Sequence, residues 1–146
     1  MSAKRLRIFG EWYLRIGLGT AFLSAVADRF GLWGPPGSKF AGWGDWAHFL
    51  QYCAQVNSFL PTAIVPALAW IATVAEIVFG VALIAGYRLR DAAYGSAVLL
   101  TFFGLAMTIT LGVKRPLGYS VFADAGAAFF LGAMLTGDSK NGRTAR

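Results

Sequence analysis

The chain has 146 residues, of which 57% are hydrophobic and only 14% are charged, and its mean hydropathy is +0.57. A water-soluble domain carries nearer a quarter charged residues, and the apolar residues here form long runs, so the composition excludes an ordinary soluble domain and favours one membrane domain. The formal charge of +6 does not indicate nucleic-acid binding, because the basic residues lie at the ends of the apolar runs, as they do beside membrane spans.

The first apolar run, residues 8–30, is predicted to be a membrane span. It ends in Ala-Asp-Arg-Phe rather than at a small-residue cleavage site, so we expect it to be retained and not removed as a signal peptide. Glu11 and Arg15 are four residues apart, the spacing of an ion pair on one helix face. The run closes at Asp28 and Arg29.

The second segment is a long loop, residues 31–61, which begins with the helix-breaking stretch GLWGPPG. Within it, residues 45–56 have apolar side chains at helical spacing, so we predict a short interfacial helix that Asp45 could cap. This stretch also holds the only histidine and the only cysteine, His48 and Cys53. One thiol forms no internal disulfide, and no metal-ligand spacing can be built, so we expect no metal site.

Three further spans are expected after the loop, joined by short basic turns. The last predicted span is only about 18 residues, and the polar tail after it is expected to be loose. Together with the first run, these segments predict an all-α integral membrane four-helix bundle, with spans at 8–30, 63–87, 92–113 and 119–136 and a tail at 137–146.

The orientation of the bundle follows from the basic residues near the span ends. With the N-terminus inside, eight Lys and Arg residues lie on the inner side and four on the outer side. Positive residues collect on the cytoplasmic side, so both termini are predicted to be cytoplasmic.

Charged residues inside the predicted spans are the candidate functional groups. Glu76 lies in the middle of the second span, and counting from the span ends places it about 16 Å from the inner surface and Arg15 about 10 Å. A long arginine side chain covers that difference, so we predict an Arg15–Glu76 contact. The same counting predicts two polar levels: an inner one of Glu11, Arg15 and Glu76, and an outer one of Asp28, Arg29 and Asp124.

Two interpretations of these charges stay open. They could be ion pairs that hold the helices in register, because a charge in a bilayer is costly unless it is paired. They could instead line a polar pocket that binds a ligand or relays protons, with Glu76 as its titrating centre. In that pocket Thr73 and Trp70 would lie near the face of Glu76, and Arg15 would be a hydrogen-bond donor.

Three stretches of the chain resemble the DoxX family of small bacterial membrane proteins. They are RIGLGTAFLSAVADRFGLWGPPG at 15–37, ATVAEIVFGVALIAGYRLRDAA at 72–93 and RPLGYSVFADAGAAFFLGA at 115–133. The resemblance implies a four-helix protein of the bacterial inner membrane. The family name derives from a subunit associated with a thiosulfate:quinone oxidoreductase, although many members have no assigned activity.

Two functions are therefore predicted. The first is a subunit or accessory of a membrane oxidoreductase system, with a pocket around Arg15 and Glu76 for a quinone or small substrate. The alternative is a non-catalytic membrane helper or assembly partner whose intramembrane charges are structural. The expected partners are the lipid bilayer and an oxidoreductase or other membrane protein, with a homo-oligomer left open and no nucleic acid.

Overall fold

A computed structural model gives the structure of the protein, and it describes residues 2–141, with side chains through residue 137. Within that range the chain is helical and has no strand. Four helices have 21 residues or more, and the remainder are short. The elements are α1 (Ala3–Arg29), α2 (Trp46–Val56), the 3-10 turn η1 (Thr62–Ile64), α3 (Val65–Ala85), α4 (Leu89–Leu111), α5 (Lys114–Gly118) and α6 (Val121–Asn141).

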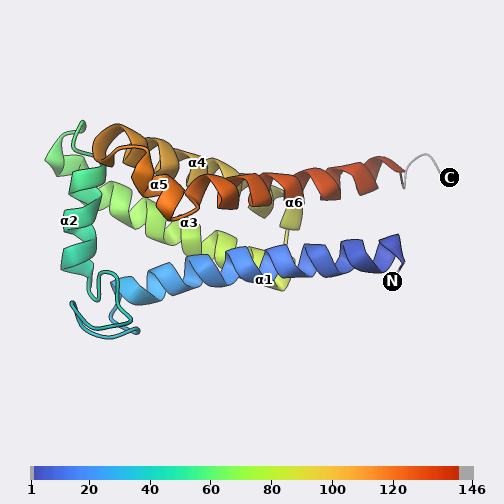
Figure 1. Ribbon diagram of the computed structural model, residues 1–146, viewed down its shortest axis with the longest axis horizontal. Helices are drawn as coiled ribbons and strands as arrows, with labels where there is room; N and C mark the ends of the chain where they lie inside the picture. Colours follow the sequence, from blue (N-terminus) through green and yellow to red (C-terminus); the bar gives the residue numbers. More distant parts are fainter. Residues whose placement is uncertain (1, 142–146) are drawn as a thin grey trace.

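The long helices lie side by side along the longest axis of the molecule, and α2 crosses one end of them (Figure 1). The start of α1 and the end of α6 lie together at the opposite end. The most extensive packing is between α4 and α6 and between α1 and α3, whereas α1 and α6 meet over a smaller contact. The bundle is thus two helix pairs packed against each other, with a cap at one end.

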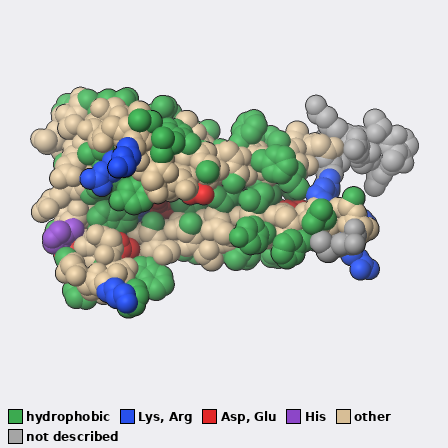
Figure 2. Space-filling view, in the orientation of Figure 1, with side chains coloured by type: hydrophobic (Ala, Val, Ile, Leu, Met, Phe, Trp, Pro, Cys, Tyr) green, Lys and Arg blue, Asp and Glu red, His purple; other side chains and the backbone are tan. Residues whose placement is uncertain are grey.

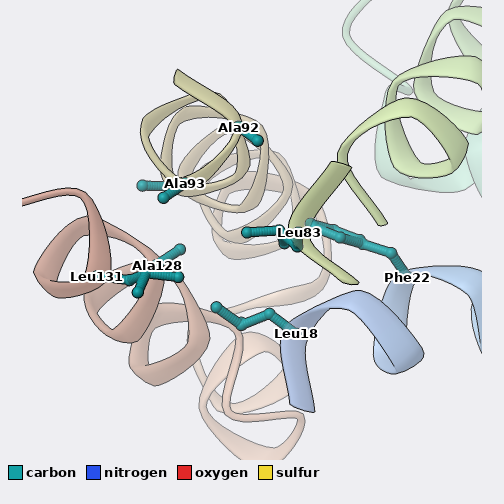
Figure 3. Close-up of a cluster of buried hydrophobic side chains, with 8 residues drawn as sticks. Leu18, Phe22, Leu83, Ala92, Ala93, Ala128 and Leu131 are labelled. Carbon is teal, nitrogen blue, oxygen red and sulfur yellow. The ribbon is translucent and has the colours of Figure 1, made fainter. Parts of the chain in front are cut away.

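The apolar core joins both pairs. Leu18 and Phe22 from α1 meet Leu83 from α3, and small residues of α4 let α6 approach closely (Figure 3). Leu83 and Leu131 are completely buried. The whole buried cluster is Leu18, Phe22, Leu83, Ala92, Ala93, Ala97, Ala128 and Leu131.

The α1–α3 crossing depends on two glycines. A β-carbon on Gly19 would lie 2.9 Å from the carbonyl oxygen of Gly80 and 2.6 Å from a side-chain carbon of Ile84. In return, a β-carbon on Gly80 would lie 3.1 Å from the Gly19 carbonyl oxygen. Glycine at both positions therefore permits the backbones to approach, as small residues do between membrane helices.

The outside of the bundle is rich in large apolar side chains, which are spread over its length (Figure 2). Two segments of the described chain are long and apolar enough to cross a membrane, Thr62–Ala85 and Leu89–Leu111, and the apolar part of α6, Val121–Gly137, is shorter. The helix α1 does not meet the same criterion within the part of the chain that the structure describes. By length and composition, two of the four predicted spans thus qualify.

Several predicted boundaries can be compared with the structure. The short helix predicted at 45–56 is present as α2, and the Asp45 carboxylate caps it by accepting the backbone N–H of His48 at 2.8 Å. The expected turn at 114–118 is instead the short helix α5. Pro116 is compatible with this helix, because it lies in the first turn, where a backbone N–H has no intrahelical partner to lose. The expected loose tail is helical through Asn141, and residues 142–146 lie outside the described range.

Candidate functional site

The chemistry of the bundle is concentrated where the end of α1 meets the middle of α3. Arg29, the last residue of α1, forms an ion pair with Glu76 through its Nη2 and the Glu76 Oε2. Its Nη1 donates to the Thr73 hydroxyl at 2.7 Å, and that hydroxyl in turn donates to the Ala69 carbonyl at 2.8 Å. Arg29, Thr73 and Glu76 are 3%, 0% and 4% exposed, so this contact excludes water.

The short helix α2 and the loop before it cover this ion pair with aromatic rings. The Arg29 guanidinium carbon lies 3.9 Å from the centre of the Phe49 ring and 5.5 Å from that of Trp43. Cations are attracted to the faces of such rings, and the attraction strengthens when water is absent. The rings of Trp43 and Phe49 also pack edge to face, with their centres 5.0 Å apart, so together they cover the Arg29 guanidinium.

The neighbouring residue, Asp28, fastens the loop to the bundle. Its carboxylate accepts the backbone N–H of Gly42 at 3.0 Å and that of Trp43 at 2.8 Å. Asp28 is 7% exposed, so these bonds satisfy a buried charge. Two consecutive residues therefore attach the loop and α2 to the bundle. Asp28 binds the backbone of the loop, and Arg29 lies between α3 and the rings of Trp43 and Phe49.

A second charged contact lies at the other end of α3. Arg15 donates from Nε to the Leu83 carbonyl at 2.9 Å and from Nη2 to the Ile84 carbonyl at 3.1 Å. The last carbonyls of a helix lack intrahelical partners and carry partial negative charge, so a cation is favourable there. The left-handed Gly86 (φ 76°) leaves room for this side chain, since a β-carbon would lie 2.6 Å from Arg15 Nη2.

The predicted ion pair between Glu11 and Arg15 is confirmed, whereas the predicted contact between Arg15 and Glu76 is wrong. Arg15 Nη1 lies 3.4 Å from Glu11 Oε1, and Glu76 is bound by Arg29. Counting from the span ends failed because α1 begins at Ala3 and its first turns extend beyond the C-terminal end of α3 (Figure 1). Arg15 consequently lies opposite the last turn of α3 rather than its middle.

The predicted outer level is also only partly assembled. Asp28 and Arg29 lie together, but no hydrogen bond or ion pair joins Asp124 to either of them among the described residues. Asp124 is half-buried on α6, which packs chiefly against α4. The depths counted along the two helices were similar. However, Asp28 and Arg29 on α1 contact the loop and α3, whereas Asp124 lies on α6, which packs against α4.

Two candidates were predicted to lie near Glu76. Thr73 accepts a hydrogen bond from Arg29 beside the ion pair, whereas the Trp70 side chain packs against α2. The Trp70 ring is 4.3 Å from that of Trp46 and 6.4 Å from that of Phe30, and Trp70 is half exposed. These rings continue the aromatic cover outward. Trp43 and Phe49 were not predicted as site residues. The signal that could have indicated them is the spacing of the aromatic residues Trp43, Trp46, Phe49 and Tyr52, which recur at every third position.

The cysteine beside the cover is poorly suited to nucleophilic chemistry. Burial raises the pKa of the Cys53 thiol to about 11, so it stays protonated at neutral pH. His48 pairs instead with Asp45, Nδ1 to Oδ1 at 2.8 Å on the exposed side of α2, and hydrogen bonds from His48 lower the pKa of Asp45. No group of three potential metal ligands converges within the described residues.

Two surface hollows flank the bundle, and neither is lined by Arg15, Arg29 or Glu76. One, of about 430 Å³, lies between α1 and the loop; the other, of about 610 Å³, is an apolar groove between α4 and α6. The charged contacts of α1 and α3 are therefore closed contacts between helices rather than walls of these hollows.

Comparisons with known proteins leave the family undetermined. No family model, no curated protein and no solved structure matches the chain. The resemblance to the DoxX family stays a prediction from the three sequence stretches.

Proposed function

We propose that the chain is an integral membrane protein of the DoxX type that crosses the bacterial inner membrane four times, with both termini in the cytoplasm. Three observations support this proposal: two apolar helices of sufficient length, the apolar exterior, and the position of the start of α1 and the end of α6 at the same end of the bundle. In this arrangement α1 and α6 are the first and fourth spans. The charges of α1 are accommodated because they contact Glu11, Glu76 and the carbonyls of α3.

Aromatic residues at both ends of the bundle agree with this topology. Trp12 and Tyr13 are exposed near the inner end, and Trp33, Trp70 and Tyr119 are exposed at the end that α2 covers. Trp and Tyr favour the two membrane–water interfaces, because their rings are apolar and carry a polar group. The span of the bilayer therefore lies between these two sets of rings.

Labelling at two sites tests the topology. In a Cys53→Ser background, we expect a membrane-impermeant maleimide to label Lys39→Cys from the periplasmic side of spheroplasts. Ser2→Cys should be labelled only after the membrane is opened. Labelling of Ser2→Cys in intact spheroplasts, without labelling of Lys39→Cys, would contradict the proposed orientation.

We further propose that the protein is a non-catalytic membrane helper or assembly partner, whose intramembrane charges hold its own helices together. The observation that carries this proposal is the closed Arg29–Glu76–Thr73 contact, in which each charge meets an opposite charge or a hydroxyl and the rings of Phe49 and Trp43 cover it. A catalytic carboxylate needs access to a substrate, and Glu76 is 4% exposed.

One observation favours a second candidate, an oxidoreductase-associated subunit that binds a quinone or another small substrate. The Arg29 Nε is buried and has no hydrogen-bond partner among the described residues. A donor that lies among aromatic rings is suited to a quinone carbonyl. The pocket would then lie at Arg29 beneath Trp43 and Phe49, rather than at Arg15.

Thermal unfolding in detergent separates the two candidates. A structural role predicts that Glu76→Gln lowers the melting temperature and that a short-chain quinone does not change the melting temperature of the wild type. Quinone binding predicts a higher melting temperature with the quinone, and Glu76→Gln or Trp43→Ala should remove that rise. Glu11→Gln, which alters a more exposed ion pair of the same helix, is the matched control.

A further inference from the structure

The groove between α4 and α6 is an open apolar hollow on the outside of the bundle. It has a volume of about 610 Å³, and its walls include Val98, Phe102 and Leu105 from α4, which are 56%, 66% and 47% exposed. Phe122 and Phe129 complete the opposite wall on α6. Small residues at Ala97, Ala125 and Gly126 form part of the lining.

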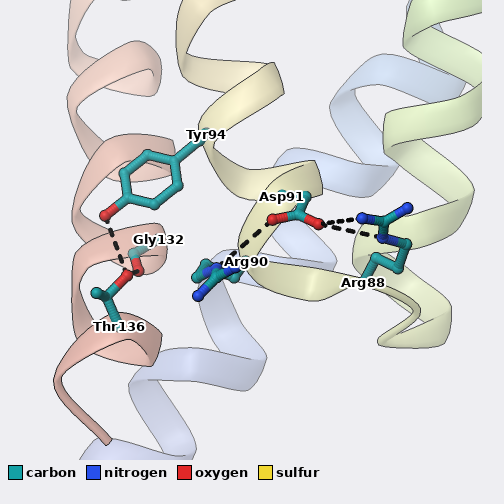
Figure 4. Close-up of polar contacts among 6 residues, drawn as sticks. All are labelled: Arg88, Arg90, Asp91, Tyr94, Gly132 and Thr136. Atoms are coloured by element: carbon teal, nitrogen blue, oxygen red, sulfur yellow. Dashed lines mark hydrogen bonds and ion pairs between the residues drawn. The ribbon is translucent and has the colours of Figure 1, made fainter. Parts of the chain in front are cut away.

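The lining offers no unpaired hydroxyl along the length of the groove. Thr101 donates its hydroxyl to the Ala97 carbonyl at 2.7 Å, so it presents its methyl group as the remaining surface. At the inner end the Tyr94 hydroxyl is 3.3 Å from that of Thr136 (Figure 4). The groove is therefore apolar along its wall and polar only at this mouth, a pattern that suits a hydrocarbon chain with a polar end.

The dimensions and position of the groove match one membrane leaflet. From Tyr94 to Leu105 the helix rises about 16 Å, roughly half of a ~30 Å hydrocarbon core. Arg90 lies one turn before Tyr94 on the same face of α4, because residues four apart are neighbours on a helix. An acyl chain in the groove would thus place its headgroup beside Arg90.

The charge at the mouth is positive. Asp91 binds Arg88 through two contacts, of 2.9 and 3.1 Å, whereas Arg90 approaches Asp91 only once, at 3.5 Å (Figure 4). The Arg90 side chain is 54% exposed. Among the residues whose side chains the structure describes, one positive charge at this turn consequently has no opposite charge of its own, and it favours an anionic headgroup.

We infer that the α4–α6 groove binds one acyl chain of an anionic phospholipid of the inner leaflet, whose phosphate contacts Arg90. This inference rests on the proposed membrane topology, because it needs the inner end of α4 at the cytoplasmic surface. The bound lipid covers the apolar wall that α4 and α6 leave open. It also links the most extensively packed helix pair of the bundle to the lipid composition of the membrane.

Lipid retention by the purified protein tests the inference. The protein is exchanged in detergent with dioleoyl phosphatidylglycerol or dioleoyl phosphatidylcholine, and bound lipid is counted by native mass spectrometry. We expect about fivefold greater retention of phosphatidylglycerol, the effect of one arginine near the headgroup. Arg90→Gln should remove this preference, whereas Lys114→Gln, which removes an exposed charge at the other end, should keep it.

Filling the groove tests the acyl-chain site separately. Gly126 lines the groove and has open space around its β-carbon position, so Gly126→Leu should remove retention of both lipids. Gly137→Leu is the matched control, because the same change also enters open space on α6 but away from the groove. Val98→Trp fills the groove from the α4 wall and serves where Gly126→Leu reduces the yield of folded protein.

Equal retention of the two lipids by the wild type would overturn the inference, as would wild-type retention by both filled variants. Carbonate extraction separates this failure from failure of the topology. A chain that stays in carbonate-washed membranes but shows no lipid preference contradicts the lipid site alone. A chain that carbonate releases contradicts both the topology and the lipid site.

Discussion

The α1–α3 and α4–α6 pairs of this bundle are held together by different interactions. Between α1 and α3, arginines bind a carboxylate, a hydroxyl and the final carbonyls of α3 around a glycine crossing. Between α4 and α6, the packing is more extensive, and it relies on small residues, aromatic rings and hydroxyls. A buried ion pair concentrates its stabilisation in two side chains, so the loss of one of them is costly. Packing of small residues spreads stabilisation over a large contact area, so we expect single substitutions there to cost less.

The largest effect is expected from breaking the Arg29–Glu76 ion pair. Removing one partner leaves a buried charge, so Arg29→Met or Glu76→Leu alone should lower the free energy of unfolding by about 3–5 kcal/mol. The double variant should recover most of this loss, because two apolar side chains need no partner. Thermal and denaturant unfolding in detergent measures this cycle.

The exposed pair of Arg88 and Asp91 is the control for that experiment. Arg88→Gln should change the free energy of unfolding by about 0–1 kcal/mol, since water screens this contact. A double variant of Arg29 and Glu76 that is as unstable as the single variants would show that the two charges do not act as a pair.

The next effect concerns the end of α3. Arg15→Lys keeps the positive charge but not the planar group that reaches two carbonyls, so we expect a loss of about 1.5–3 kcal/mol. Hydrogen exchange should increase in the last turn of α3, around Leu83 and Ile84, and change little elsewhere. Arg5→Lys, on the exposed start of α1, should have no such effect.

The glycine crossing should be sensitive to a single methyl group. Gly19→Ala forces a contact with the backbone of Gly80, and overpacking of this kind costs about 1–3 kcal/mol. Gly132→Ala in the α4–α6 pair meets the Tyr94 ring at 3.0 Å, and a ring shifts more easily than a backbone, so its loss should be smaller. Gly17→Ala on α1 meets open space and should not destabilise the protein. Equal losses at Gly19 and Gly17 would contradict the close crossing.

The smallest effect is expected at the N-terminal end of α4. Tyr94→Phe removes the 3.3 Å hydrogen bond to Thr136, whose hydroxyl still donates to the Gly132 carbonyl at 2.9 Å. The expected loss is about 0.5 kcal/mol. Tyr87→Phe, an exposed tyrosine at the end of the neighbouring pair, provides the comparison in the same unfolding assay. If Tyr94→Phe lowers the free energy of unfolding by more than the value expected for Arg15→Lys, the α4–α6 pair is stabilised mainly by hydroxyl contacts and not by packing.

The sequence predicted the helical class, the short helix of the loop and the Glu11–Arg15 pair. These features are local: apolar runs, helical spacing over 45–56 and an i,i+4 pair are visible without knowing which helices meet. The ends of α5 and α6 were less well predicted, because helix limits depend on packing as well as propensity. Arg29 and Glu76 were both identified as candidates, but Glu76 was assigned Arg15 as its partner instead of Arg29.

That assignment needed the tertiary structure for a physical reason. Depth counted along a helix does not say how far one helix slides past another or which neighbour a side chain faces. The protrusion of α1 beyond α3 places Arg15 on the Leu83 and Ile84 carbonyls and leaves Arg29 to Glu76. By itself, the sequence determined that charges must be satisfied inside an apolar helical bundle; only the packing of α1, α2 and α3 decided which charges meet and that aromatic rings cover them.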